Sequence, residues 1–145
     1  DWITSRGLGD VYKRQAINRT ARLAEGWLGT PSSTPQQAEE QLNQYRQACA
    51  EHQRKPSAVA LRRDIFIGAS VREAEEFRSH AVAKGYRGFP ERALICGDIS
   101  QVATQFAELF EAGFTDIIVR NMASDQGQAL ATIEALSDVK RQLRL

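Results

Sequence analysis

The sequence predicts an α/β fold with a parallel sheet, and two observations support this prediction. Short apolar runs rich in β-branched residues alternate with segments of helical spacing, an order typical of right-handed crossovers between parallel strands. The clearest run is residues 117–119, which follow the helix-ending Gly113 and show no polar alternation, as expected of a strand covered by helices. About three such strands are too few to bury both faces of a sheet. We therefore expect the carboxyl-terminal part of a larger α/β barrel.

The helices are predicted from their capping residues. A Ser, Thr or Asp before the first turn accepts a hydrogen bond from the backbone, and Gln or Glu three positions later completes a capping box. Four pairs fit this pattern: Thr34 with Gln37, Ser70 with Glu73, Asp98 with Gln101 and Asp125 with Gln128. The elements expected in chain order are a helix at 16–25, a strand at 26–29, a helix of about eighteen residues from Pro35, a strand at 61–68 with 65–67 at its core, a helix opened by Ser70, a turn at 85–97, a helix opened by Asp98, a strand at 117–119 and a helix opened by Asp125.

Composition and charge exclude several functional classes. With 145 residues, 42% hydrophobic and 26% charged, the chain fits one globular domain. Its 19 basic and 18 acidic side chains form no block of one sign, so neither nucleic acid nor a membrane surface is an expected partner. No run approaches the roughly 20 apolar residues of a membrane span. Cys49 and Cys96 lack a CxxC spacing, which favours reduced, inert thiols in a cytoplasmic protein.

Residues 1–15 are expected to stand apart from the partial barrel domain at 16–145. They match no element period and contain no cap leading into the helix predicted at 16–25. Their stretch RGLGDVYKRQ resembles translated adapter sequence, which predicts a non-native leader. The alternative is a genuine leader segment.

Four stretches, in this order, resemble the luciferase-like flavin-dependent monooxygenase family. They are RTARLAEGWLG at 19–29, RRDIFIGASVREAE at 62–75, ALICGDISQVATQF at 93–106 and EAGFTDIIVRNM at 111–122. The match covers the chain from Ala16 onward. The resemblance implies a TIM-type (β/α)8 barrel of roughly twice this length, of which the chain holds the last three strands with their helices.

The resemblance also implies an oxidoreductase that binds reduced flavin (FMN) or a deazaflavin coenzyme, acts on a small organic substrate and is a homodimer when full length. The cofactor carries the redox chemistry, and the protein supplies the pocket and the orientation. The glycine pair that the family places before the helix at 16–25 is absent, as are the earlier strands with the usual active-site histidine. The catalytic residues are therefore expected upstream, this chain alone is expected to be inactive, and the choice between flavin and deazaflavin stays open.

Arg120, Asn121 and Met122 are the first candidates for substrate or cofactor binding, because they follow the clearest strand. Functional residues of parallel barrels lie at the carboxyl ends of strands, and the planar guanidinium of arginine suits carboxylate, sulfonate or phosphate. In the family that the chain resembles, the position matching Arg120 often faces the anionic end of the substrate. The alternatives are a salt bridge for Arg120 and a space-filling role in the core for Met122.

Trp27 and Thr30 flank the end of the first predicted strand, where an aromatic wall and a hydroxyl could contact substrate or flavin. The alternative for Trp27 is packing in the core. Arg63 and Asp64 precede the apolar part of the second strand, and we expect a structural ion pair between them, with a direct functional role as the alternative.

No metal site is expected, because His52 and His80 belong to no HExxH pattern and no carboxylate cluster accompanies them. The leading hypothesis is thus a fragment of a flavin- or deazaflavin-dependent oxidoreductase. The contrasting hypothesis is a complete small α/β module that binds a ligand or partner without catalysis.

Overall fold

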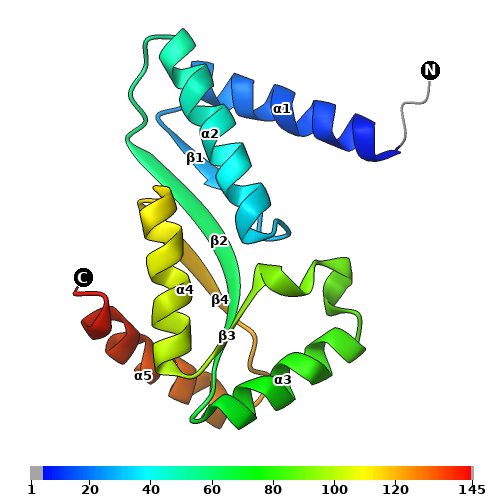
Figure 1. The fold of residues 1–145 in the computed structure, drawn as a ribbon, viewed down its shortest axis with the longest axis vertical. Helices are drawn as coiled ribbons and strands as arrows, with labels where there is room; N and C mark the ends of the chain where they lie inside the picture. The colour runs from blue at the N-terminus through cyan, green and yellow to red at the C-terminus, as the bar shows by residue number, and fades with distance from the viewer. Residues whose placement is uncertain (1–4, 145) are drawn as a thin grey trace.

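The fold is a parallel sheet with flanking helices, described for residues 5–144 in a computed structural model (Figure 1). The strands are β1 (Gly26–Gly29), β2 (Ala58–Ile67), β3 (Leu94–Gly97) and β4 (Asp116–Asn121). The helices are α1 (Ser5–Leu23), α2 (Pro35–Glu51), α3 (Val71–Ala83), α4 (Ile99–Ala112) and α5 (Gln126–Gln142), with two short 3-10 turns, η1 (Tyr86–Gly88) and η2 (Glu91–Ala93). No helix among these residues is long and apolar enough to cross a membrane.

Strand β2 is the centre of the sheet, and the other three strands pair with it in parallel. Strand β1 pairs with its first part, up to Leu61, and β3 pairs with its last part, from Asp64. Strand β4 pairs with residues 60–65 of β2 and therefore shares residues with both of them. Because each residue has only two edges, β4 must lie on the edge opposite to β1 and β3.

The N-cap residues predicted for four helices are confirmed, and two of the four predicted capping boxes are complete. Thr34 and Asp98 form complete capping boxes with Gln37 and Gln101, so two backbone donors are satisfied at the start of α2 and again at the start of α4. Ser70 and Asp125 accept the expected hydrogen bond from the third residue of α3 and of α5. Gly113 ends α4 with a φ of 114°, which a side chain would strain.

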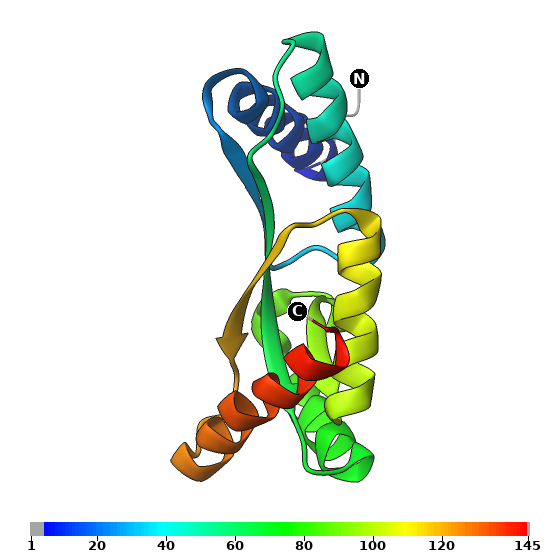
Figure 2. The ribbon, with the colours of Figure 1, turned by 90° about the vertical axis from the view of Figure 1, so that its left-hand side faces the viewer.

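The two faces of the sheet differ in what covers them. Alternate residues of β2 point to opposite faces. The helix-covered face, which carries Leu61 and Ile65 of β2, packs against α1, α2, α4 and α5 in the larger hydrophobic core. Figure 2 shows α2 and α4 on one side of the sheet, seen along its edge.

The open face carries Asp64 and Phe66 of β2. Near the end of the strand α3 covers it, with the rings of Phe66 and Phe77 stacked at 3.9 Å in a second, smaller core. Toward the start of the strand, the apolar side chains of Leu28 and Ile118 are 55% and 49% exposed on the neighbouring strands. This part of the open face is therefore an apolar sheet surface that no described residue covers.

Three expectations about the elements are corrected by the structure. The turn predicted at 85–97 contains a fourth strand, β3, whose four residues are all buried against the end of β2. The first helix begins at Ser5 rather than at residue 16, so the backbone of residues 5–15 continues α1, whereas residues 1–4 lie outside the described residues. Strand β2 begins at Ala58 rather than at residue 61, so Arg63 and Asp64 lie in its middle with buried apolar residues on both sides.

Candidate functional site

A buried carboxylate, Asp64, is the centre of a polar cluster on the open face. Its side chain is 0% exposed, and strands β3 and β4 flank it. Arg120, its direct register partner on β4, places Nε 3.0 Å from Oδ1 and donates from Nη2 to Oδ2 at 3.2 Å. A two-pronged, charge-assisted contact of this kind is among the strong polar interactions in proteins. Arg120 therefore neutralises a carboxylate that burial alone would disfavour.

Two side chains from the η1 turn complete the cluster. The hydroxyl of Tyr86 donates to Oδ2 of Asp64 at 3.2 Å, and Nη1 of Arg87 lies 3.4 Å from the same oxygen. Burial first, and then the charge of Asp64, raise the pKa of the Tyr86 hydroxyl above its ordinary value, so it stays a donor at neutral pH. Asp64 therefore accepts hydrogen bonds from the η1 turn and from β4, two segments that are far apart in the sequence.

The backbone of the η1 turn is strained where it supplies these groups. Four consecutive residues, 85–88, have positive φ values, and two of them, Tyr86 at 35° and Arg87 at 56°, are not glycine. Such conformations cost on the order of 1–3 kcal/mol each and persist where surrounding contacts fix them. Here the contacts are those to Asp64 and the guanidinium of Arg87 over the ring of Phe89, 4.6 Å from its centre.

Positive charge exceeds negative charge around Asp64. Arg87 and Arg120 both pair with this one carboxylate, and Arg62 lies on the same face two residues earlier in β2. The other carboxylate of this face, Asp116, lies at the opposite end of β4, on an exposed position. Three arginines thus lie near one buried carboxylate, so the cluster keeps a positive charge that Asp64 does not neutralise. Such a charge suits an anionic ligand group.

The three candidates after the last strand do not all share one site. Met122 lies on the same side as Arg120, and its Sδ is 2.9 Å from Nη2 of Arg120. Asn121 instead fixes the connection to α5: its Nδ2 donates to the carbonyl of Ala129, and its Oδ1 accepts from the backbone of Ala123. The structure thus brings Arg120 and Met122 together and directs Asn121 to the loop.

Trp27 and Thr30 lie away from Asp64. The Trp27 ring packs in the larger core on the helix-covered face, stacked on Tyr45 and Phe114 at centroid distances of 5.4 and 6.3 Å. Thr30 Oγ1 lies 2.9 Å from Ser32 Oγ. Both residues line a hollow of about 400 Å³ beside α1 and α2.

The expected ion pair between Arg63 and Asp64 is wrong. Neighbouring residues of a strand point to opposite faces, so Asp64 pairs with Arg120 and Arg87 on the open face while Arg63 lines a pocket next to α2 and α4. Tyr86 and Arg87 were missed by the sequence-based reasoning. The available signals were the charge of Asp64 inside an apolar strand and the GYRG stretch, whose two glycines permit the unusual backbone.

The remaining reactive side chains form no centre of their own. Among residues 12–144, whose side chains the structure describes, there is no group of three or more His, Cys, Asp or Glu arranged to hold a metal ion. His52 is exposed at the carboxyl end of α2, and His80 is exposed on α3. Both cysteines are buried; burial raises the pKa of the Cys96 thiol to about 11, and its Sγ donates to the carbonyl of Ala74.

Comparison with known proteins gives matches at the level of structure only. No family model and no curated protein matches the sequence. A monooxygenase, RslO1 from Streptomyces bottropensis, has a TM-score of 0.71 at 13% identity over 91% of this chain and 46% of its own. The coenzyme F420-dependent tetrahydromethanopterin reductase from Methanopyrus kandleri has a TM-score of 0.60 at 18% identity over 83% and 46%.

A third solved structure is a type II Baeyer-Villiger monooxygenase, the oxygenating constituent of 3,6-diketocamphane monooxygenase from Pseudomonas putida, in complex with FMN. It has a TM-score of 0.61 at 16% identity over 83% of this chain and 43% of its own. The chain thus spans less than half the length of each of these three enzymes. Its fold is that of a partial α/β barrel, with the parallel sheet and flanking helices that it shares with about half of each of these three enzymes.

Proposed function

We propose that the chain is part of a flavin- or deazaflavin-dependent oxidoreductase of the luciferase-like monooxygenase type that acts on a small organic substrate. The observation that carries this proposal is the shared fold, which extends over 83% of the chain both in the F420-dependent reductase and in the FMN-bound Baeyer-Villiger monooxygenase. Fold alone does not imply function. The site on the open face supplies the second line of support.

The open face has the properties of a barrel interior that further strands would complete. Leu28 on β1 and Ile118 on β4 expose apolar side chains on either side of β2, on the face that carries Asp64. In a closed parallel barrel such side chains pack in interior layers, and functional groups gather at the carboxyl ends of the strands. Arg120 and Met122 are at the carboxyl end of β4, so they would lie near the barrel mouth.

In this proposal Arg120 and Arg87 bind an anionic group of the substrate or the phosphate of the cofactor. Arg120 is 38% exposed and Arg87 is 45% exposed, so both combine an anchored contact to Asp64 with access from outside. Asp64 acts as the positioning residue that orients both guanidinium groups. The cofactor, when bound, supplies the redox chemistry, and the residues of this chain bind, orient and exclude water.

Trp27, Thr30 and Asn121 have other roles in this proposal than direct contact with the group bound by Arg120. Trp27 and Thr30 line the hollow beside α1, which could contact a different part of the full-length enzyme. Asn121 contributes indirectly, because it fixes the loop that follows Arg120. The homodimer and the cytoplasmic location stay predictions.

Turnover by the longer protein tests the proposal. The longer protein encoded by the surrounding reading frame is expressed. It is assayed with reduced FMN for substrate-dependent oxygen uptake and with F420 for substrate-dependent hydride transfer. Substrate-dependent turnover with either cofactor is the expected result. If the reading frame encodes only this α/β module, and it binds a ligand or partner without turnover, the proposed function is wrong.

A further inference from the structure

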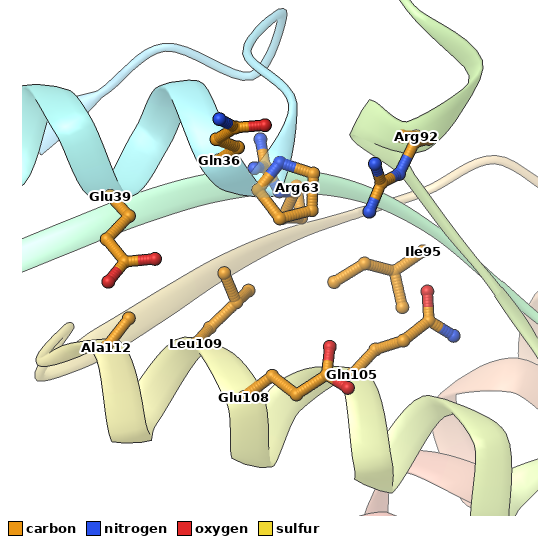
Figure 3. A pocket seen from close by; sticks show the side chains of 10 residues that line it. Gln36, Glu39, Arg63, Arg92, Ile95, Gln105, Glu108, Leu109 and Ala112 are labelled. Carbon is orange, nitrogen blue, oxygen red and sulfur yellow. The ribbon is translucent and has the colours of Figure 1, made fainter.

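A second cationic site lies on the helix-covered face, separate from the Asp64 cluster. A pocket of about 230 Å³ opens between α2, α4 and the η2 turn. Its charged lining residues are Arg63, Arg92, Glu39 and Glu108 (Figure 3). None of them belongs to the open face or takes part in the proposed oxidoreductase site.

Arg63 is a buried cation whose hydrogen bonds are incomplete. It is 0% exposed, and its Nη1 makes one long contact of 3.5 Å to the carbonyl of Pro31. Nε and Nη2 are buried and donate to no described residue. Burial lowers the pKa of Arg63 to about 10, which still leaves the guanidinium protonated at neutral pH. A buried, protonated and under-paired guanidinium is costly unless a ligand or water satisfies it.

Arg92 supplies a second guanidinium to the same pocket from the η2 turn. In Figure 3 its guanidinium is turned toward the side of the pocket where Arg63 lies. Arg92 is exposed, and no described carboxylate forms an ion pair with it. Arg63 and Arg92 thus both line this pocket, and two guanidinium groups are suited to an anion with at least two oxygens.

The acidic side chains limit which anion fits. Glu39 on α2 and Glu108 on α4 are exposed residues at the other side of the pocket, and their charge disfavours a large polyanion. The pocket volume of about 230 Å³ also limits the size of the ligand. The geometry points to a site for a small oxyanion, a phosphate or a carboxylate, held between Arg63 and Arg92.

Binding of inorganic phosphate and of acetate to this chain tests the site. Sodium phosphate and sodium acetate are titrated at constant ionic strength against sodium chloride, and the melting temperature is recorded. A ligand that binds only the folded state raises the melting temperature in a saturable way. We expect saturation with at least one of the two anions, and the anion that saturates identifies the chemical class.

Variants separate the pocket from general salt effects. Arg92→Gln, at an exposed position, should weaken binding by roughly tenfold or more, since it removes a charge-assisted contact. Arg63→Met should abolish the anion effect, and Glu108→Gln should strengthen binding because it removes a like charge. Arg72→Gln, which alters an exposed arginine on α3, is the matched control and should leave binding unchanged.

Three results would overturn the inference. The first is a melting temperature that responds equally to chloride, phosphate and acetate. The second is an anion effect that Arg92→Gln and Arg63→Met both leave intact. The third is a Glu108→Gln variant that loses stability and shows no anion effect, because Glu108 would then be the counter-ion of Arg63.

Discussion

Replacing Asp64 by asparagine should destabilise the chain by about 2 kcal/mol. The substitution keeps the shape but removes the charge that Arg120, Arg87 and Tyr86 share. Breaking a fully buried ion pair costs about 3–5 kcal/mol. The cost here should be lower, because Arg120 and Arg87 are 38% and 45% exposed and can regain water when their partner is lost.

A double-mutant cycle isolates the pair at the centre of the cluster. Urea unfolding of the chain, of Asp64→Asn, of Arg120→Gln and of the double variant gives the coupling energy, which should be about 1–2 kcal/mol. The matched control is the cycle of Arg72→Gln with Glu76→Gln, whose side chains are 89% and 65% exposed. That pair should couple by less than about 0.5 kcal/mol. An Asp64–Arg120 coupling no larger than the control would refute the reasoning.

Three further outcomes are expected. In the longer enzyme, Arg120→Lys should lower kcat/KM for anionic substrates by roughly ten- to a hundredfold, as steady-state kinetics would show, while neutral substrates are little affected. Neither Cys49 nor Cys96 should react with a disulfide reagent at pH 8, because both are buried and the Cys96 pKa of about 11 leaves roughly one thiolate in a thousand; fast native labelling would contradict this. Removing residues 1–15 should change the unfolding free energy by less than about 0.5 kcal/mol, because the buried residues of α1, Ile17 and Ala21, are retained; a loss of several kcal/mol would show that the first turns of α1 stabilise the fold.

Local signals in the sequence were sufficient for most of the fold. Thr34, Ser70, Asp98 and Asp125 cap their helices through residues only three positions away, so a short window contains all the information. Gly113 likewise ends α4 by its own backbone conformation. The order of strands and capped helices then led to the parallel sheet, which the structure confirms.

Non-local pairing explains what was missed. Strand β3 is four residues long, and it becomes a strand only because it pairs with the last part of β2. The partner of Asp64 is Arg120, 56 positions later, whereas its sequence neighbour Arg63 points to the other face. The role of Arg87 depends on a positive φ that its own residue type disfavours. None of these relations is visible in a short window of sequence.

The central claim is that this chain is part of a larger barrel that binds FMN or a deazaflavin. Fluorescence titration of this chain and of the longer protein from the same reading frame, with FMN and with F420, tests it most directly. The account predicts no saturation for this chain at micromolar cofactor and saturation at one site per chain for the longer protein. Saturable micromolar binding by this chain alone, at one site per chain, would contradict it.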